Sequence, residues 1–225
     1  MLKRSVYIWE WPVRIYHWIN VALMAILIIT GLYIGAPILS TPGEAYANFI
    51  MGKVRYWHAL AAWIFIANLI FRFYWAFVGN EYAQFKPWRK GFFTDGIETA
   101  KYYLFLKKEH TVHGGHNVVA QLTYFLFMWV GSFFMIFTGF ALQGELNPGG
   151  FQEKFMGWLI PLFGGSSFVL RSYHHLAAWA FVVFIIAHLY LVIRQDILDD
   201  DGTVSSIISG HKYLLADGEG ENDKD

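Results

Sequence analysis

The stretch FVLRSYHHLAAWAFVVFIIAHLYLVI, which runs from Phe168 to Ile193, decides the fold of this chain. It is almost wholly apolar, and a helix needs roughly 20 apolar residues to cross the hydrocarbon core of a bilayer, which is about 30 Å thick. Three further runs of this kind occupy residues 15–34, 54–78 and 118–142. The sequence therefore predicts four transmembrane helices, with both ends of the chain on one side of the membrane.

The composition supports this interpretation. Of the 225 residues, 56% are hydrophobic and only 15% are charged, which is outside the usual range of soluble domains. The absence of cysteine excludes disulfides, iron–sulfur clusters, covalently attached haem c and thiolate zinc sites. We expect an all-α, integral membrane four-helix bundle that forms a single domain over residues 1–225, surrounded by lipid and not bound to nucleic acid.

The distribution of positive charge predicts the orientation. Of the 17 Lys and Arg residues, 13 fall in the termini, in the loop from Asn80 to Gly115 or at the helix ends that adjoin them. Positive residues accumulate on the cytoplasmic side of bacterial membrane proteins. Both termini are therefore predicted to be cytoplasmic, in the bacterial cytoplasmic (inner) membrane. The acidic tail over about 215–225 is predicted to be disordered.

Two loop segments are predicted to be helices that lie on the membrane surface. In the outer loop, apolar residues at helical spacing indicate an amphipathic helix, which either docks a partner or only covers the end of the bundle. These residues are Phe151, Phe155, Trp158, Leu159 and Leu162. The inner segment from Gly96 to Lys108 is similar but more charged, and it is predicted to be a solvated interfacial helix.

Four histidines lie within the spans or close to their ends, namely His17, His58, His174 and His188. Ionisable groups at membrane depth are costly, so each is a candidate for function. His174 and His188 are 14 residues apart, which returns a helix to within about 40° of the same face after a rise of roughly 21 Å. The neighbouring His175 would face about 140° away from His188 and is the weaker alternative.

Depth pairs these histidines across the bundle. His17 and His188 lie near the inner ends of their spans, whereas His58 and His174 lie near the outer ends. Each pair offers two neutral imidazoles, the axial ligands of a low-spin electron-transfer haem b, so the sequence predicts two haem b groups. A zinc site would need three or four ligands at one depth. A single such histidine is more often an interfacial anchor, but four at two matched depths favour haem.

The motifs that surround these histidines resemble the cytochrome b subunit of membrane-bound nickel–iron hydrogenases along nearly the whole chain. They are PVRIYHW (12–18), RYWH (55–58), GHNVVAQ (115–121), YHHLAAW (173–179), HLY (188–190), RQDI (194–197) and TVSSIISG (203–210). The chain departs from the family at Gln195, where an acidic residue is common, and at His211, where an aromatic is common.

The resemblance implies a dihaem membrane anchor that accepts electrons from the hydrogenase small subunit, beside the large subunit, at the outer face. It implies the same four haem ligands, and an electron-transfer subunit rather than a stand-alone enzyme. We expect electrons to enter at the outer pair, His58 and His174, and to leave through the inner pair, His17 and His188.

A quinone, either menaquinone or ubiquinone, is expected to bind near the inner haem, where it needs hydrogen-bonding groups at the membrane edge. The candidates are His116, Asn117, Gln121, Arg14 and Arg194. The alternative is that Asn117 only caps the third helix and His116 is interfacial.

Other functions remain open from the residues alone. The cytochrome b subunit of formate dehydrogenase is similar in its helices and histidines but has a different partner. A transmembrane cytochrome b that works without a hydrogenase would also have paired histidines. A transporter or a plain anchor is a further class, but the spans have few polar residues at mid-membrane and no internal repeat.

Overall fold

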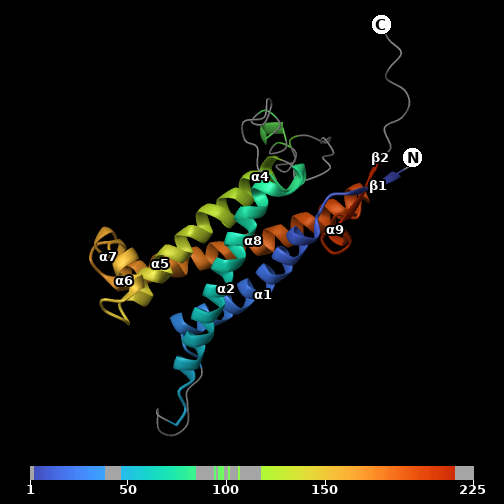
Figure 1. Cartoon of the computed structure of the whole chain (residues 1–225). Coiled ribbons are helices and arrows are strands. Elements are labelled where there is room, and N and C mark those ends of the chain that lie inside the picture. The colour runs from blue at the N-terminus through green and yellow to red at the C-terminus, as the bar shows by residue number, and fades with distance from the viewer. Residues whose placement is uncertain are drawn as a thin grey trace, which may run out of the picture. The chain divides into compact units, whose positions relative to one another are not determined.

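The computed structural model describes residues 3–38, 47–84, 94, 96–98, 101, 106 and 118–215 (Figure 1). Four helical segments in these residues are long and apolar enough to cross a membrane, which confirms the four predicted spans. They are α1 (Trp11–Gly35), α2 (Ile50–Val78), the third span, formed by α4 (Val118–Tyr124), η2 (Phe125–Gly131) and α5 (Ser132–Gly144), and α8 (Ser167–Asp199).

These helices turn most of their apolar side chains outward. In an apolar stretch of 18 residues taken from each helix, only 6% of the residues are buried within the chain in α1 and in α8, and 28% in α2. A soluble helix would bury such residues in a core, whereas a membrane helix has lipid for its solvent. The chain is therefore a multi-pass membrane protein that is mostly helical, as the sequence predicts.

The third span is not a regular α-helix, because η2 is a π-helix. The Ser132 hydroxyl donates to the carbonyl of Phe127, at 3.3 Å, across its wider turn. Gly131 lies against α8 so closely that a Cβ there would be 3.0 Å from Cζ of Phe181. The sequence predicts the extent of this span but not its π-helix, since hydropathy reports apolar length and not the width of a turn.

Contacts divide the chain into two compact units. The terminal unit comprises Met1–Trp18, Phe71–Gln121 and Ala187–Asp225, and the central unit comprises Ile19–Ile70 and Leu122–Ile186. The predicted helix from Gly96 to Lys108 and the predicted disordered tail lie largely outside the described residues.

The terminal unit contains a two-stranded sheet, which corrects the all-α expectation. Strand β1 (Lys3–Tyr7) pairs antiparallel with β2 (His211–Leu215), so the two ends of the described chain lie side by side (Figure 1). His211 pairs with Tyr7 in this register. Each strand is only five residues long, and its partner is some two hundred residues away, so no local pattern could predict the pairing.

The short helix α9 (Thr203–Ser209) leads into β2 through Gly210. Gly210 has a φ of +87°, and its carbonyl accepts hydrogen bonds from the amides of Ile8 and Trp9. A Cβ at this position would lie 2.6 Å from the ring of Tyr7. Only glycine fits both the left-handed backbone and the close approach of the N-terminal segment.

The core of the terminal unit joins the N-terminal segment to the residues that follow α2, and Ile207 of α9 packs against it. Ile8, Trp9, Val13 and Ala83 form a buried cluster. Beside it, the side-chain amide of Asn80 donates to the carbonyl of Ile8, at 2.8 Å. The carboxylate of Glu10 accepts from the indole of Trp75 (3.0 Å) and from the amide of Asn80 (2.8 Å). Asn80 also caps η1 (Glu81–Ala83), the single turn that follows α2.

An exposed ion pair ties β1 to the residue that follows α8. Lys3 Nζ lies 2.7 Å from Oδ2 of Asp200, and this hydrogen bond and charge hold the pKa of the Asp200 carboxyl below its ordinary value of 3.8. A lowered folded pKa stabilises the folded state above the unfolded value, and the contribution is lost as the pH falls through the folded value.

We expect the amides of β1 and β2 to lose protection from hydrogen exchange as the pH falls below that ordinary value of 3.8, more so in the wild type than in Asp200→Asn. The effect should be small, since exposed ion pairs contribute little. Equal pH dependence in the two proteins would contradict it.

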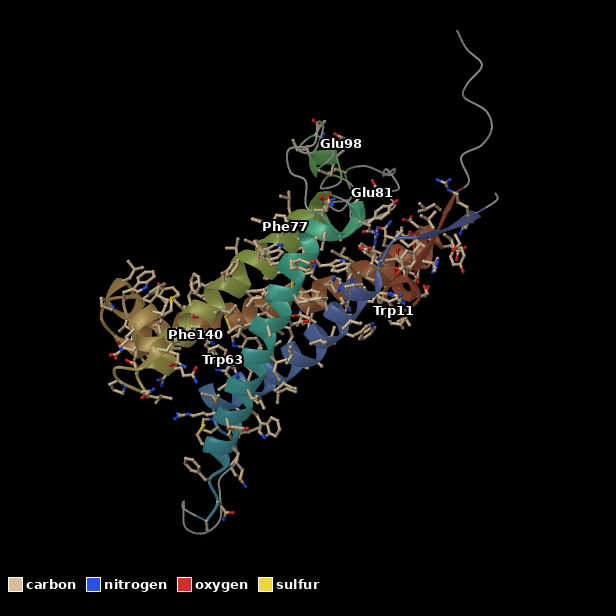
Figure 2. The ribbon with its side chains drawn as sticks, viewed as in Figure 1. Trp11, Trp63, Phe77, Glu81, Glu98 and Phe140 are labelled. Carbon is tan, nitrogen blue, oxygen red and sulfur yellow. The ribbon has the colours of Figure 1, made fainter. Side chains whose placement is uncertain are left out.

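The central unit packs around two apolar clusters. In one, Leu23, Ala61, Phe65 and Leu69 bring α1 and α2 together. In the other, Ala141, Leu159 and Leu170 join α5, α7 and α8. Trp63 of α2 and Phe140 of α5, both labelled in Figure 2, are in ring contact, with centroids 5.1 Å apart. These contacts hold together the helices that carry the central histidines.

The predicted outer amphipathic helix is formed as two short helices, α6 (Phe151–Met156) and α7 (Leu159–Leu162). Leu159 is buried in the core, while the other four apolar residues of the pattern are more than half exposed. They are Phe151, Phe155, Trp158 and Leu162. The helix breaks after Met156, where Gly157 occupies the C-terminal cap of α6. The predicted apolar surface is therefore present, on two helices and not one.

Candidate functional site: two pairs of histidines

The central unit brings together the two histidines predicted for the outer site. His58 lies on α2 and His174 lies on α8, and the two imidazoles are within electrostatic range of each other. Both side chains are half-buried. The structure thus brings these two predicted site residues near each other.

A threonine contacts each of these rings from a neighbouring helix. Thr30 Oγ1 of α1 lies 2.8 Å from Nδ1 of His58. Thr138 Oγ1 of α5 lies 2.7 Å from Nδ1 of His174. In each case the contact is made by Nδ1, which leaves the other ring nitrogen, Nε2, for a metal.

A glycine follows each threonine and lets the ring approach the helix. A Cβ on Gly31 would lie 3.2 Å from Cε1 of His58, and a Cβ on Gly139 would lie 3.6 Å from Cε1 of His174. The first distance is tighter than ordinary van der Waals contact, whereas the second is not. The sequence shows both glycines as small residues, but only the structure assigns each to a histidine.

His175, the weaker ligand candidate, occupies a different place. Its ring lies against Gly35 of α1, where a Cβ would be 2.7 Å from Cε1 of His175. It also contacts Trp179 edge to face, with centroids 6.4 Å apart. Gly35 and Trp179 thus border the ring of His175, which also lies within electrostatic range of its neighbour His174.

The terminal unit brings together the inner pair. His17 of α1 and His188 of α8 lie within electrostatic range of each other. Among the described residues, Nδ1 of His17 has no hydrogen-bond partner although it is buried. His188 is exposed at the surface of the chain.

The donor atoms fit haem better than a bare metal ion. Among the described residues, no three His, Asp or Glu side chains gather to hold a metal. Two imidazoles per site are too few for a protein-bound zinc, but haem brings its own four equatorial nitrogens and needs only two axial ligands. The unpartnered nitrogen of His17 and the glycine beside each ring of the outer pair fit that requirement.

Only some of the predicted quinone residues are among those that the structure describes. His116 and Asn117 lie outside the described residues. Gln121 is half-buried on α4, and Arg194 is half-buried on α8. Arg14 is buried, and its guanidinium stacks on the ring of Trp11, at 4.0 Å from the centroid, and donates to the carbonyl of Ile208. Arg14 therefore also has a structural role that the sequence did not predict.

Paired histidines on helices that cross a membrane define a class, the helical membrane proteins that hold haem between neighbouring helices. The comparison with known families is more specific. Residues 8–210 match the family described as prokaryotic cytochrome b561, and the chain belongs to this family. Membership implies that the cofactor is haem b.

Proteins from several bacteria are similar in sequence to this chain along nearly its whole length. The chain is 39% identical over 214 residues to the probable Ni/Fe-hydrogenase B-type cytochrome subunit of Cupriavidus necator. The match covers 93% of this chain and 87% of the relative. It is 38% identical to the protein of the same description from Azotobacter chroococcum, with 96% and 91% covered. It is also 38% identical to the probable Ni/Fe-hydrogenase 1 B-type cytochrome subunit of Escherichia coli, with 92% and 91% covered. The resemblance drawn from the motifs is confirmed.

Proposed function

We propose that this chain is the dihaem b-type cytochrome of a nickel–iron hydrogenase complex and passes electrons from hydrogen oxidation to a membrane quinone. The names of the relatives support the hydrogenase partner. The observation that supports the dihaem part is that the imidazoles of His58 and His174, and those of His17 and His188, lie within electrostatic range of each other. The alternative, a subunit of formate dehydrogenase or another periplasmic oxidoreductase, has the same helices but no support from those names.

In this proposal, His58 and His174 would hold one haem b, and His17 and His188 would hold the other. Haem supplies a centre that carries one electron at a time and needs no proton. The imidazoles would hold it through neutral nitrogen, so that the ligands themselves add no charge at membrane depth.

The hydrogenase small and large subunits would bind on the outer side, and the quinone on the inner side near His17 and His188. Arg14, Gln121 and Arg194, together with His116 and Asn117, remain the proposed quinone residues. Both termini and β1 with β2 would then be cytoplasmic. This orientation rests on the distribution of Lys and Arg.

The test is to purify the full-length chain with its complex and to measure haem by the pyridine haemochrome method. We expect two b-type haems per chain, both reduced when hydrogen is added and both reoxidised by a quinone analogue. Formate serves as the matched control donor and should reduce neither. Reduction by formate and not by hydrogen would favour the alternative partner, and absence of haem would leave a membrane anchor.

A further inference from the structure

We propose that Thr30 and Thr138 are positioning residues that fix the tautomer and the ring plane of the haem ligands His58 and His174. This inference rests on the proposed function, because it takes these two histidines as axial ligands. The two contacts form a repeated device: a Thr-Gly pair on one helix faces a histidine on the next. Thr30-Gly31 of α1 faces His58 of α2, and Thr138-Gly139 of α5 faces His174 of α8.

The proton of the Thr30 hydroxyl takes part in a hydrogen bond within α1. Thr30 Oγ1 lies 2.6 Å from the carbonyl oxygen of Ile26, one turn earlier in α1. A carbonyl can only accept, so two oxygens at that distance repel each other unless the hydroxyl proton lies between them. The hydroxyl therefore donates to Ile26 and has only lone pairs left for His58.

The consequence for His58 is a defined tautomer. Its Nδ1 lies 2.8 Å from Thr30 Oγ1 and must bring the proton to this hydrogen bond. A neutral imidazole that carries its proton on Nδ1 has its lone pair on Nε2, which is the form that binds iron.

The same reasoning applies to His174. Thr138 Oγ1 lies 2.7 Å from the carbonyl oxygen of Phe134 and 2.7 Å from Nδ1 of His174. The hydroxyl donates to the carbonyl and accepts from the ring. Both histidines of the outer site therefore carry their proton on Nδ1. Each is held by a threonine whose rotation is restricted by a hydrogen bond to its own helix.

A hydrogen bond from the far nitrogen of a ligating histidine fixes the ring and makes the ligand more basic. A more basic ligand stabilises the ferric state and lowers the reduction potential. In contrast, Nδ1 of His17 has no such partner among the described residues. The threonines therefore act on the outer haem alone and help to separate its potential from that of the inner haem.

The test compares Thr30→Val and Thr138→Val, which keep the shape and remove the hydroxyl, with Thr30→Ser and Thr138→Ser, which keep the hydroxyl. The full-length chain is purified with its haem in detergent. The readouts are haem content, the midpoint potential of each haem and the low-spin ferric EPR signals, whose largest g value depends on the angle between the imidazole planes. Ser132→Ala is the control, since its hydroxyl donates to the carbonyl of Phe127 on the same span.

We expect each valine variant to raise the potential and to shift the EPR signal of one haem, while the other haem is unchanged. Haem affinity at that site should fall by about 10-fold or more, as it does when ligand-orienting groups are removed from metal sites. The serine variants and Ser132→Ala should match the wild type.

The glycines provide a second, independent comparison. Gly31→Ala should shift the same signals as Thr30→Val, because a Cβ there would be 3.2 Å from His58 Cε1. Gly139→Ala should leave these signals nearly unchanged, because a Cβ there would be 3.6 Å from His174 Cε1, which is an ordinary contact.

Valine variants with wild-type potentials and EPR signals would overturn the inference. Haem loss that serine does not restore would also overturn it, since the cause would then not be the hydroxyl. Failure of the proposed function has a different outcome: the wild type would hold no haem, or His58→Ala and His174→Ala would both retain two.

Discussion

Replacing His174 with alanine is expected to lower the haem content from two per chain to one and to abolish electron transfer from hydrogen to quinone. The loss is selective because His174 and His58 serve one site in the proposal, whereas His17 and His188 serve the other. Quinone reduction should fall by at least about 100-fold, since even removal of a group that orients a metal ligand costs about 10–100-fold. The pyridine haemochrome assay and hydrogen-dependent quinone reduction measure both effects.

The neighbouring histidine gives a matched control. His175→Ala should retain both haems, because the ring of His175 lies against Gly35 and Trp179 and His175 is not a ligand in the proposal. His188→Ala should remove the other haem, and its remaining EPR signal should differ from that of His174→Ala. If His175→Ala lost a haem and His174→Ala did not, the ligand assignment on α8 would be wrong.

The number of spans could be predicted because apolar length indicates a span. The spacing of 14 residues from His174 to His188 predicts a shared helix face, and the pairing of the histidines stays a prediction. The threonines could not be found in this way. A threonine in an apolar helix commonly bonds to the carbonyl one turn earlier, and only the packed structure reveals that a histidine also contacts it.

The sheet and α9 of the terminal unit also could not be predicted, because they too depend on contacts between distant parts of the chain. The pairing of β1 with β2 joins the two ends of the chain, and its five-residue strands have no apolar alternation that could be recognised. The family motif TVSSIISG (203–210) pointed to this region but not to its structure. It forms α9 and ends at Gly210, whose left-handed backbone receives the N-terminal segment.

The terminal unit also contains a buried ion pair whose removal should have a large effect. Lys212 Nζ of β2 lies 2.6 Å from Oδ2 of Asp201, and both side chains are more than 90% buried. The other carboxylate oxygen of Asp201 accepts from the amide and the hydroxyl of Thr203, the first residue of α9. Among the described residues, each charge is therefore compensated by this arrangement.

Lys212→Met should destabilise the terminal unit by about 3–5 kcal/mol, because it leaves the carboxylate of Asp201 buried without a counter-charge. Asp201→Asn should have a similar cost, since the ammonium of Lys212 would then be unpaired. The double variant should cost less than the sum of the two, as neither charge then remains. Hydrogen exchange of the β1 and β2 amides measures this stability.

The effect should reach the inner haem through α9, which holds the start of α1. Arg14 donates to the carbonyl of Ile208, and the indole of Trp18 donates to the carbonyl of Ile207, at 3.3 Å. His17 lies between these two residues in the chain. Lys212→Met should therefore weaken retention of the haem bound by His17 and His188 while the haem of the central unit stays in place. Equal loss of both haems would mean that the whole chain had unfolded, and retention of both with unchanged exchange would show that the buried pair contributes little.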